Sequence, residues 1–493
     1  MMKKTIYFLL AGLVCFLGVI DDLHAQDIYY SKERKFSFQN GDFEVVGWSG
    51  DRLYTYRASK EGFFLDAYND SMRLMATIAL DFFPQKIYET KFINYDDQIT
   101  VLFQALQSNY VVQYAVRLDG RARMLQRPVA LDSVKTGWFG PSKSYYSSVV
   151  SSDKGRIMIY GLGKAGKSSG LSTILLDKQL NVIARSQPAL DASISDFTLG
   201  QAILGNDGSL YLSGYTEGGA KGYGGEARIL KLAQGATVFQ AGVLPLKELY
   251  ISGMYIKLDD NTNEIYLSAF YSLKKSGNID GVLYGLYSPA QDSMTIFKAI
   301  PFDEQMRNAT DERNKKKAFN EFEVRNIIVK NDGGFILVAE NFYMNTRTSY
   351  GPGYGGFYSS YYNYNYPGMN TSVREYVYGD ILVLNYDGAG NRQWHNFIRK
   401  EQYSQDDGGL FSSFGMINSG ASLVFLYNDF TNSKSNLSLA AVDVSGKLQL
   451  KKLNAGSGND GDWLPRSGKQ TDATELIVPV LHKNNLSFAK LAF

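Results

Sequence analysis

The sequence predicts an all-β fold, a single β-propeller of eight four-stranded blades. Short apolar or alternating runs bounded by Asp, Asn and Gly fill the chain, whereas long amphipathic helical patterns are scarce. One unit of four strands also recurs from one end of the chain to the other. A continuous repeat of this kind is typical of a closed ring of blades. Seven blades is the nearest alternative.

The clearest part of the repeat is the tight turn between its first and second strands. It reads NDG at 206–208 and again at 331–333. The turn between the third and fourth strands begins with Asp177, Asp387 and Asp443 in its clearest copies. These residue types suit tight turns, because Asp caps its own turn and Gly tolerates a positive φ.

Seven full copies of the unit and one shorter copy cover the chain. The full copies begin near Asp42, Tyr88, Ser147, Phe197, Ile251, Phe322 and Phe411. The last copy begins near Asp462 and has three strands. The stretch KFSFQ at 35–39 is a spare strand of the right length. We expect it to pair with the C-terminal strand 486–493, because that pairing completes the last blade and closes the ring.

The first 25 residues have the pattern of a secretory signal peptide. Two lysines precede an apolar run over 6–20, which is shorter than the roughly 20 residues needed to span a membrane. Cleavage near Ala25 leaves a propeller domain over 26–493, expected in the periplasm or outside the cell with no transmembrane segment. Cys15 is the single cysteine, so the mature chain is expected to have no disulfide and no thiolate.

The charge of the chain is nearly balanced, but its two predicted ends differ. With 51 basic and 49 acidic residues the chain lacks the basic surplus of a nucleic-acid-binding protein. The loops between second and third strands hold ten bases and three acids, whereas the first-to-second turns hold nine acids and two bases. Turn chemistry explains the acidic end. The basic end favours an anionic partner, such as an acidic glycan or a membrane surface.

The end with the long loops is the predicted ligand face, because binding sites concentrate on loops over rigid scaffolds. A Tyr/Gly-rich insertion at 344–379 belongs to it. Tyrosine offers a flat apolar face and one hydroxyl, which suits sugars and proteins. The alternative is that the insertion is a low-complexity loop that lies over the ring and binds nothing. The candidate binding residues are Tyr350, Tyr354, Tyr358, Tyr361, Tyr362, Tyr364, Tyr366, Trp138, Phe139, Lys274 and Lys275.

Residues that commonly carry out catalysis are scarce in this sequence. Only His395 and His482 remain after the signal, so a Ser-His-Asp triad or a histidine metal site is not expected. We predict no catalytic residue, metal or cofactor. Carboxylates that adjacent blades present across a central channel remain a route to glycosidase chemistry, but no spacing singles out a pair.

Two short motifs resemble known propeller repeats. SSDKGR at 151–156 resembles the start of the Asp-box of sialidase-like propellers, and DGAGNRQW at 387–394 resembles the Asp-to-Trp turn of quinoprotein-type repeats. The whole layout resembles secreted bacterial propeller-like repeat proteins of unassigned function, a likeness that carries over no catalytic residue. We therefore expect a monomeric, non-catalytic binding module whose partner is a glycan or an envelope protein. The alternative is a glycan-active enzyme, hydrolase or lyase, with carboxylates in the channel.

Overall fold

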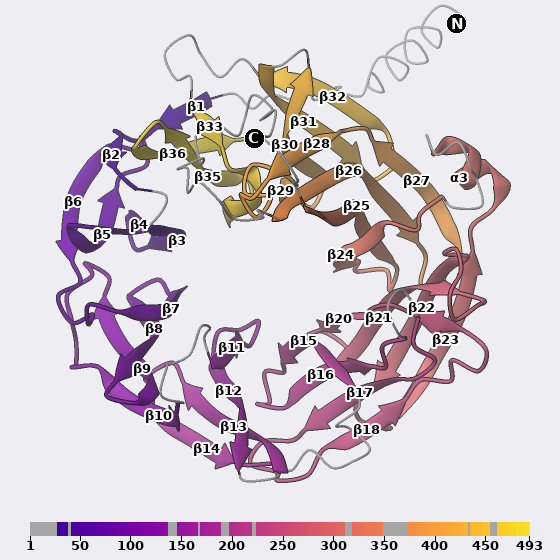
Figure 1. Cartoon of the computed structure of the whole chain (residues 1–493), viewed down its shortest axis with the longest axis horizontal. Helices are drawn as coiled ribbons and strands as arrows, with labels where there is room; N and C mark the ends of the chain where they lie inside the picture. Colours follow the sequence, from indigo (N-terminus) through magenta and orange to yellow (C-terminus); the bar gives the residue numbers. More distant parts are fainter. Residues whose placement is uncertain are drawn as a thin grey trace, which may run out of the picture.

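Eight antiparallel sheets stand around a central opening in the computed structural model of the chain (Figure 1). The eight-bladed propeller predicted from the sequence is confirmed, and seven blades are excluded. The structure describes residues 27–37, 41–136, 145–165, 168–188, 197–218, 223–310, 318–348, 372–431, 434–453 and 461–493.

Blades 1 to 4 each contain four strands that follow one another from the channel outward. Blade 1 is β3 (Asp42–Ser49), β4 (Arg52–Ser59), β5 (Gly62–Tyr68) and β6 (Leu74–Ala79). Blade 2 is β7 (Ile87–Asn94), β8 (Gln98–Gln107), β9 (Tyr110–Asp119) and β10 (Val129–Lys135). Blade 3 is β11 (Tyr146–Val150), β12 (Arg156–Ala165), β13 (Ser168–Asp177) and β14 (Val182–Ser186). Blade 4 is β15 (Thr198–Leu204), β16 (Leu210–Tyr215), β17 (Ala227–Leu232) and β18 (Gln240–Val243).

Blades 5 to 7 keep this order, and two of them gain an extra strand. Blade 5 is β19 (Tyr250–Ile251), β20 (Tyr255–Asp259), β21 (Glu264–Ser272), β22 (Gly281–Ser288) and β23 (Ser293–Pro301). Blade 6 is β24 (Phe322–Val329), β25 (Phe335–Thr348), β26 (Ser372–Tyr386), β27 (Arg392–Ile398) and β28 (Gln402–Gln405). Blade 7 is β29 (Phe414–Asn418), β30 (Ser422–Thr431), β31 (Lys434–Asp443) and β32 (Leu448–Leu453). The short helix α3 (Glu304–Ala309) lies between blades 5 and 6.

Blade 8 joins the two ends of the chain. Its strands are β33 (Asp462–Trp463), β34 (Lys469–Asp472), β35 (Glu475–His482), β36 (Asn485–Ala492), β1 (Asp27–Tyr30) and β2 (Arg34–Lys35), with the 3-10 helix η2 (Pro465–Ser467) after β33. Both β1 and β2 pair with β36. The predicted closure by an N-terminal strand is therefore confirmed.

The longer closing strand, β1, lies earlier in the chain than the expected segment 35–39, of which Lys35 alone among the described residues belongs to a strand paired with β36. Asp27–Tyr30 pairs with the end of β36, and the ring of Tyr30 packs edge-on against Trp463 at 5.9 Å. Phe36 lies in the core between blades 8 and 1, where only 4 % of it is exposed. The start of the expected segment thus pairs with β36 as predicted, whereas its apolar residue Phe36 fills the core.

The core lies between neighbouring blades, because each sheet is buried on both faces. Leu337 and Val338 are consecutive in β25 and both are fully buried. Leu337 joins a cluster with blade 5, and Val338 joins a cluster with blade 7. Stacked aromatic rings continue the contact between blades 5 and 6, with Tyr284 and Phe335 at 4.4 Å between ring centres. Runs that are apolar at every position thus suit a blade held between two others.

The two ends of the ring are built differently. We call the end with the first-to-second and third-to-fourth strand turns the turn end, and the opposite end the loop end. The NDG turns lie at the turn end, where Gly208 and Gly333 have φ of +85° and +79°. No helix in the described part of the chain is long and apolar enough to cross a membrane.

Candidate functional site

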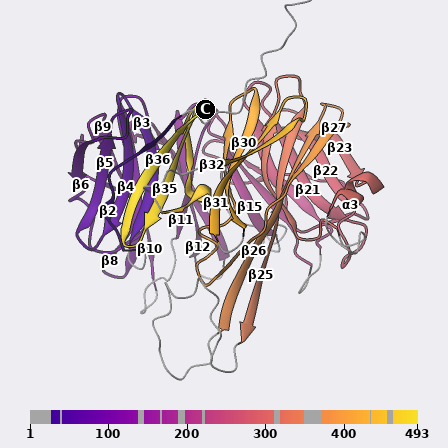
Figure 2. The ribbon, with the colours of Figure 1, turned by 90° about the horizontal axis from the view of Figure 1, so that it is seen from above.

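The largest feature of the loop end is a sheet that projects from the ring. The strands β25 and β26 are 14 and 15 residues long and extend well past the other blades (Figure 2). The inner strand β24 accompanies β25 only as far as Asn341. On the other side, β28 pairs with β26 from Glu375 to Tyr378. Beyond the ring, the order is therefore β25, β26, β28; we call this unit the projecting sheet.

Buried charges anchor the root of the projecting sheet. The carboxylate of Glu340 on β25 lies 2.8 Å from the ammonium of Lys400, and neither side chain is exposed. The guanidinium of Arg325 lies 3.1 Å from the same carboxylate. The Ser413 hydroxyl donates to it at 2.8 Å. Desolvation lowers the pKa of Lys400, and the negative charge of Glu340 opposes that shift. Such a network fixes geometry because every charged group has a partner.

A second layer of hydrogen bonds ties this root to blade 7. The Gln402 side chain accepts from Lys400 at 2.9 Å and donates to the backbone oxygen of Asn428 at 2.8 Å. The Asn428 side chain donates in turn to the backbone oxygens of Phe411 and Trp463. The projecting sheet is thus held by blades 6, 7 and 8 together, which suits a rigid platform.

Beyond its root, the projecting sheet exposes large side chains. Tyr343, Met344 and Tyr403 are 36 %, 52 % and 48 % exposed. Tyr343 lies opposite Val377 in β26, which lies opposite Tyr403 in β28, so these three form one row across the sheet. The Tyr403 hydroxyl donates to Glu375 at 2.7 Å. The row is an apolar strip with hydrogen-bonding groups at its margin, and such strips suit contact with a partner.

Most predicted binding residues lie outside the described residues. These are Tyr350, Tyr354, Tyr358, Tyr361, Tyr362, Tyr364, Tyr366, Trp138 and Phe139. The ends of the predicted insertion are strand, because β25 runs to Thr348 and β26 starts at Ser372. Lys274 and Lys275 are exposed in the loop between β21 and β22, at the loop end as predicted. The backbone oxygen of Lys275 accepts from Tyr223 at 2.8 Å, which joins blades 4 and 5.

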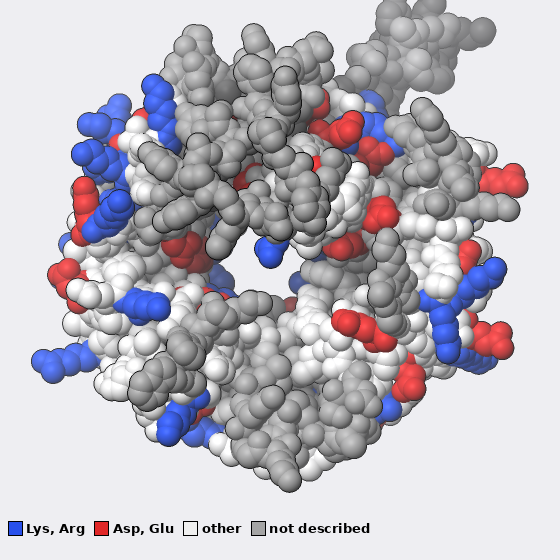
Figure 3. Space-filling view, viewed as in Figure 1, with Lys and Arg blue, Asp and Glu red and all other residues white. Residues whose placement is uncertain are grey.

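The loop-end part of the channel contains carboxyl groups with raised pKa values. Glu44 on β3 is the strongest case: desolvation raises its pKa to about 7, although Lys469 and Lys91 oppose the shift. Asp42 at the start of β3 is exposed to solvent, yet the surrounding protein still raises its pKa by desolvation. Desolvation also raises the pKa of Glu323 at the start of β24. Charged side chains of both signs surround the opening (Figure 3).

Lysines satisfy the free edges of the innermost strands. The ammonium of Lys469 donates to the backbone oxygen of Val46 at 2.9 Å, from blade 8 to blade 1. Lys91 donates to Ser148 at 2.7 Å, from blade 2 to blade 3. An unpaired strand edge is open to wrong pairing, and lysine is a common way of blocking it. These channel lysines therefore have a structural use.

At the turn end, the aspartates are bound within their own turns. Backbone N–H donation from Gly334 and the ion pair with Lys330 lower the pKa of Asp332. Hydrogen bonds from Ser445 and Lys447 lower that of Asp443. Asp207 accepts from both the backbone and the hydroxyl of Ser209. Turn chemistry thus accounts for these acidic residues, as the sequence predicted.

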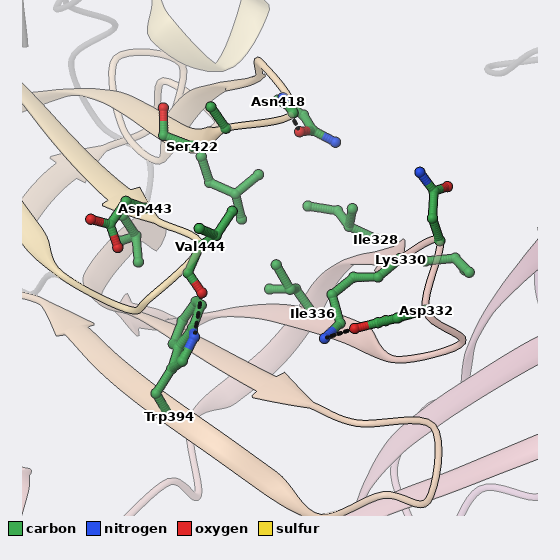
Figure 4. Close-up of a pocket in the computed structure, with 15 residues that line it drawn as sticks. Ile328, Lys330, Asp332, Ile336, Trp394, Asn418, Ser422, Asp443 and Val444 are labelled. Carbon is green, nitrogen blue, oxygen red and sulfur yellow. Dashed lines mark hydrogen bonds and ion pairs between the residues drawn. The ribbon is translucent and has the colours of Figure 1, made fainter. Parts of the chain in front are cut away.

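A groove of about 450 Å³ opens at the turn end between blades 6 and 7 (Figure 4). Ile328 and Ile336 form part of its apolar wall, and the ion pair of Lys330 with Asp332 lies at its rim. The indole N–H of Trp394 donates to the backbone oxygen of Val444 at 3.1 Å. This bond links blade 6 to blade 7, so Trp394 has a structural role in addition to lining the groove.

Among the described residues, neither His395 nor His482 belongs to a cluster that could hold a metal ion. The Nδ1 of His482 lies 2.9 Å from Glu33, which also accepts from Asn485 and so fastens the closing segment. Desolvation lowers the pKa of His395. Within the described ranges, no three His, Cys, Asp or Glu side chains gather in a way that would hold a metal ion.

Sequence reasoning missed the anchoring network, the channel carboxyls and the groove. Glu340 and Lys400 are 60 positions apart, and no local pattern pairs them. The walls of the groove consist of ordinary strand residues such as Ile328 and Leu423. One usable signal existed for Glu44, since it is a charged residue near the start of a predicted first strand, and first strands lie nearest the central opening (Figure 1).

Fold and surface together define an all-β eight-bladed propeller with one projecting sheet. No family model and no curated protein matches the sequence. Prolyl oligopeptidase B from Galerina marginata is structurally similar, with a TM-score of 0.43 and 10 % identity over 90 % of this chain and 55 % of that one. This chain spans about half the length of that enzyme.

Two further solved structures are similar at the same low level. The dihydro-heme d1 dehydrogenase NirN has a TM-score of 0.41 and 13 % identity, over 90 % of this chain and 69 % of that one. A protein of unknown function from Bacteroides caccae has a TM-score of 0.29 and 10 % identity, over 73 % of this chain and 94 % of its own. These likenesses concern the fold alone.

Proposed function

We propose that this protein is a non-catalytic binding module of the cell envelope whose ligand face is the loop end. The partner is an envelope protein or a glycan, and the basic loops favour an anionic one. The projecting sheet is the observation that carries the proposal. Its buried ion pairs hold it rigid, while Tyr343, Met344 and Tyr403 remain exposed.

Rigidity matters because a preorganised surface loses less conformational entropy when a partner binds. Exposed tyrosines on strands supply contact area with only two side-chain torsions each. At the turn end, by contrast, Asp207 and Asp332 are occupied by their own turns. The loop end is therefore the better candidate for recognition.

Site-specific photo-crosslinking tests the proposal. A photoreactive residue at Tyr343 is expected to give discrete crosslinks with solubilised envelope proteins or envelope glycans. The matched control places the same residue at Val238, which is 72 % exposed at the turn end. Replacing residues 349–371 with a short Gly/Ser linker, which retains both strands, is expected to weaken the crosslinks. Equal yields at both positions would contradict the proposal.

A second candidate function has specific support from the channel. Asp42 and Glu44 are two positions apart on β3, so they point to the same side with Cα atoms about 7 Å apart. Glycosidases place two carboxyl groups about 5 to 10 Å apart and keep one protonated near neutral pH. A pKa of about 7 gives Glu44 that property. Turnover on a polysaccharide panel, abolished in Glu44→Gln, would establish this function; folded protein without turnover would remove it.

A further inference from the structure

One edge of the projecting sheet is not paired with any described strand. From Phe335 to Asn341, β25 has β24 on one side and β26 on the other. From Tyr343 to Thr348, β26 is its only partner among the described residues. β28 covers the far side of β26, so the β25 edge is the one that no described strand covers. An open edge presents unpaired backbone donors and acceptors.

Strand geometry identifies which backbone groups face outward. The N–H of Phe342 donates to the backbone oxygen of Glu321 at 2.7 Å, so it points away from β26. Successive residues of an antiparallel strand point their N–H and C=O groups to alternate sides. The register from Phe342 to Thr348 contains no shift. Met344, Thr346 and Thr348 therefore also point outward, and together they offer about six hydrogen-bonding groups.

This edge lacks the protections found on other outer strands. Lys135 ends β10, Lys298 and Pro301 lie in β23, and Lys452 lies in β32. Lysine and proline in such places discourage another chain from pairing. The segment from Tyr343 to Thr348 contains neither residue type, and Arg347 is its one charged residue. It also extends clear of the ring, so that a partner can approach (Figure 2).

The chemistry of the edge identifies its occupant. A row of outward N–H and C=O groups at two-residue spacing matches an extended polypeptide, which adds as a further strand. Beside that strand lie Tyr343 on one face of the sheet and Met344 on the other, so apolar side chains of the incoming segment gain contacts on both faces. A glycan cannot reproduce such a ladder.

We propose that the β25 edge from Met344 to Thr348 receives an extended segment of a partner protein, which becomes the fourth strand of the projecting sheet. This inference rests on the proposed binding function and narrows the partner to a protein. Backbone pairing supplies affinity, and the apolar side chains of the partner strand supply selectivity.

The test uses the full chain and a synthetic peptide. The probe has eight residues, alternating valine and threonine between terminal glutamates, with blocked ends. We expect it to bind with a dissociation constant of about 1 mM or below. Hydrogen exchange at the amides of Met344, Thr346 and Thr348 is expected to slow on binding. The same peptide with N-methyl groups on alternate amides should not bind, because it lacks the donors.

Matched variants locate the binding. Thr346→Pro removes an outward N–H and leaves the bonds to β26 intact, and proline is tolerated on edges whose N–H faces solvent. It is expected to weaken peptide binding at least about tenfold, whereas Thr346→Val, which retains the N–H, has little effect. Unchanged exchange at Tyr343 and Asn345 verifies that the hairpin survives.

The outcomes separate this inference from the proposed function. Peptide binding that Thr346→Pro does not change, or no peptide binding at all, overturns strand addition. If Tyr343 crosslinks to envelope components in that case, the binding function stands and the partner contacts the sheet face. If neither peptide binding nor crosslinking occurs, both proposals fail.

Discussion

The carboxyl groups at the two ends of the ring have opposite environments. At the turn end, Asp332 and Asp443 accept hydrogen bonds from their own turns, and their pKa values are lowered. At the loop end, Glu44 and Glu323 are crowded by protein, and desolvation raises their pKa values. At the turn end, acidic residues thus stabilise the turns in which they lie. At the other end, burial makes the charged form of the acidic residues unfavourable. Carboxyl groups with perturbed pKa values cluster at functional sites, so a functional explanation is favoured there.

The largest expected effect comes from breaking the buried charge pair under the projecting sheet. Glu340→Gln leaves the Lys400 ammonium without its carboxylate in a fully buried place. We expect a loss of about 3 to 5 kcal/mol in unfolding free energy, measured by urea titration. The double variant Glu340→Met with Lys400→Met should recover most of the loss, because no buried charge remains. A loss below about 1 kcal/mol for the single variant would show that the loop end is not anchored in this way.

Glu44 should give stability a pH dependence opposite to that of the turn end. Its folded pKa of about 7 lies above the usual value of 4.5, so the folded state binds the proton more tightly than the unfolded state. Its contribution is therefore greatest below about pH 4.5 and is lost as the pH rises through 7. Glu44→Gln should match the wild type at pH 4 and exceed it by about 1 to 3 kcal/mol at pH 8. Urea titrations at both pH values measure this difference, and an equal difference at both would contradict the assignment.

Asp119 tests whether the acidic residues of the turn end stabilise their own turns. Desolvation alone would raise its pKa, but hydrogen bonds from the backbone and side chain of Arg123 and the backbone of Arg121 lower it overall. Its contribution is present above the unfolded pKa and is lost as the pH falls. Asp119→Ala should cost about 1 kcal/mol at pH 7, and less at pH 3. Asp119→Asn, which retains an acceptor, is the control. A cost that grows as the pH falls would contradict the turn explanation.

The smallest effect on stability is expected at the exposed lysines of the loop end. Replacing Lys274 and Lys275 with serine should change the unfolding free energy by less than about 0.5 kcal/mol, because both side chains are exposed. Binding to heparin, used as an anionic polymer, should nevertheless weaken. Removing two exposed lysines at the turn end, Lys178 and Lys447, is the matched control. Equal weakening by both pairs would show that the charge effect is not specific to one end.

The fold was largely predictable because its signals are local. Alternation and tight-turn residues are read over a few positions, so blade starts such as Asp42, Phe322 and Asp462 coincide with the observed strands. The main closing strand was misplaced because Asp27–Tyr30 is a short segment without a strong apolar pattern. Phe36 has the stronger apolar pattern but serves the core.

The candidate site was less predictable because it depends on contacts between blades. Composition directed attention to the Tyr-rich segment, and the structure finds long strands at both of its ends. No pattern indicated that β24 begins only at Phe322, opposite Asn341, which leaves the edge of β25 beyond Asn341 without β24. The pKa of Glu44 depends in part on Lys469, which is more than 400 positions away. Such relations exist only in the folded ring.

Ring closure by β1 also has a consequence for the order of folding. The first strand of the propeller has its partner, β36, more than 450 positions further along the chain. Blades 1 to 7 can form as the polypeptide emerges, but the contact between blades 8 and 1 must wait until β36 has been synthesised. Until then β1 lacks its own partner and is available to the β36 of another molecule, an exchange that would link two rings. Dilution during refolding should favour the closed single ring.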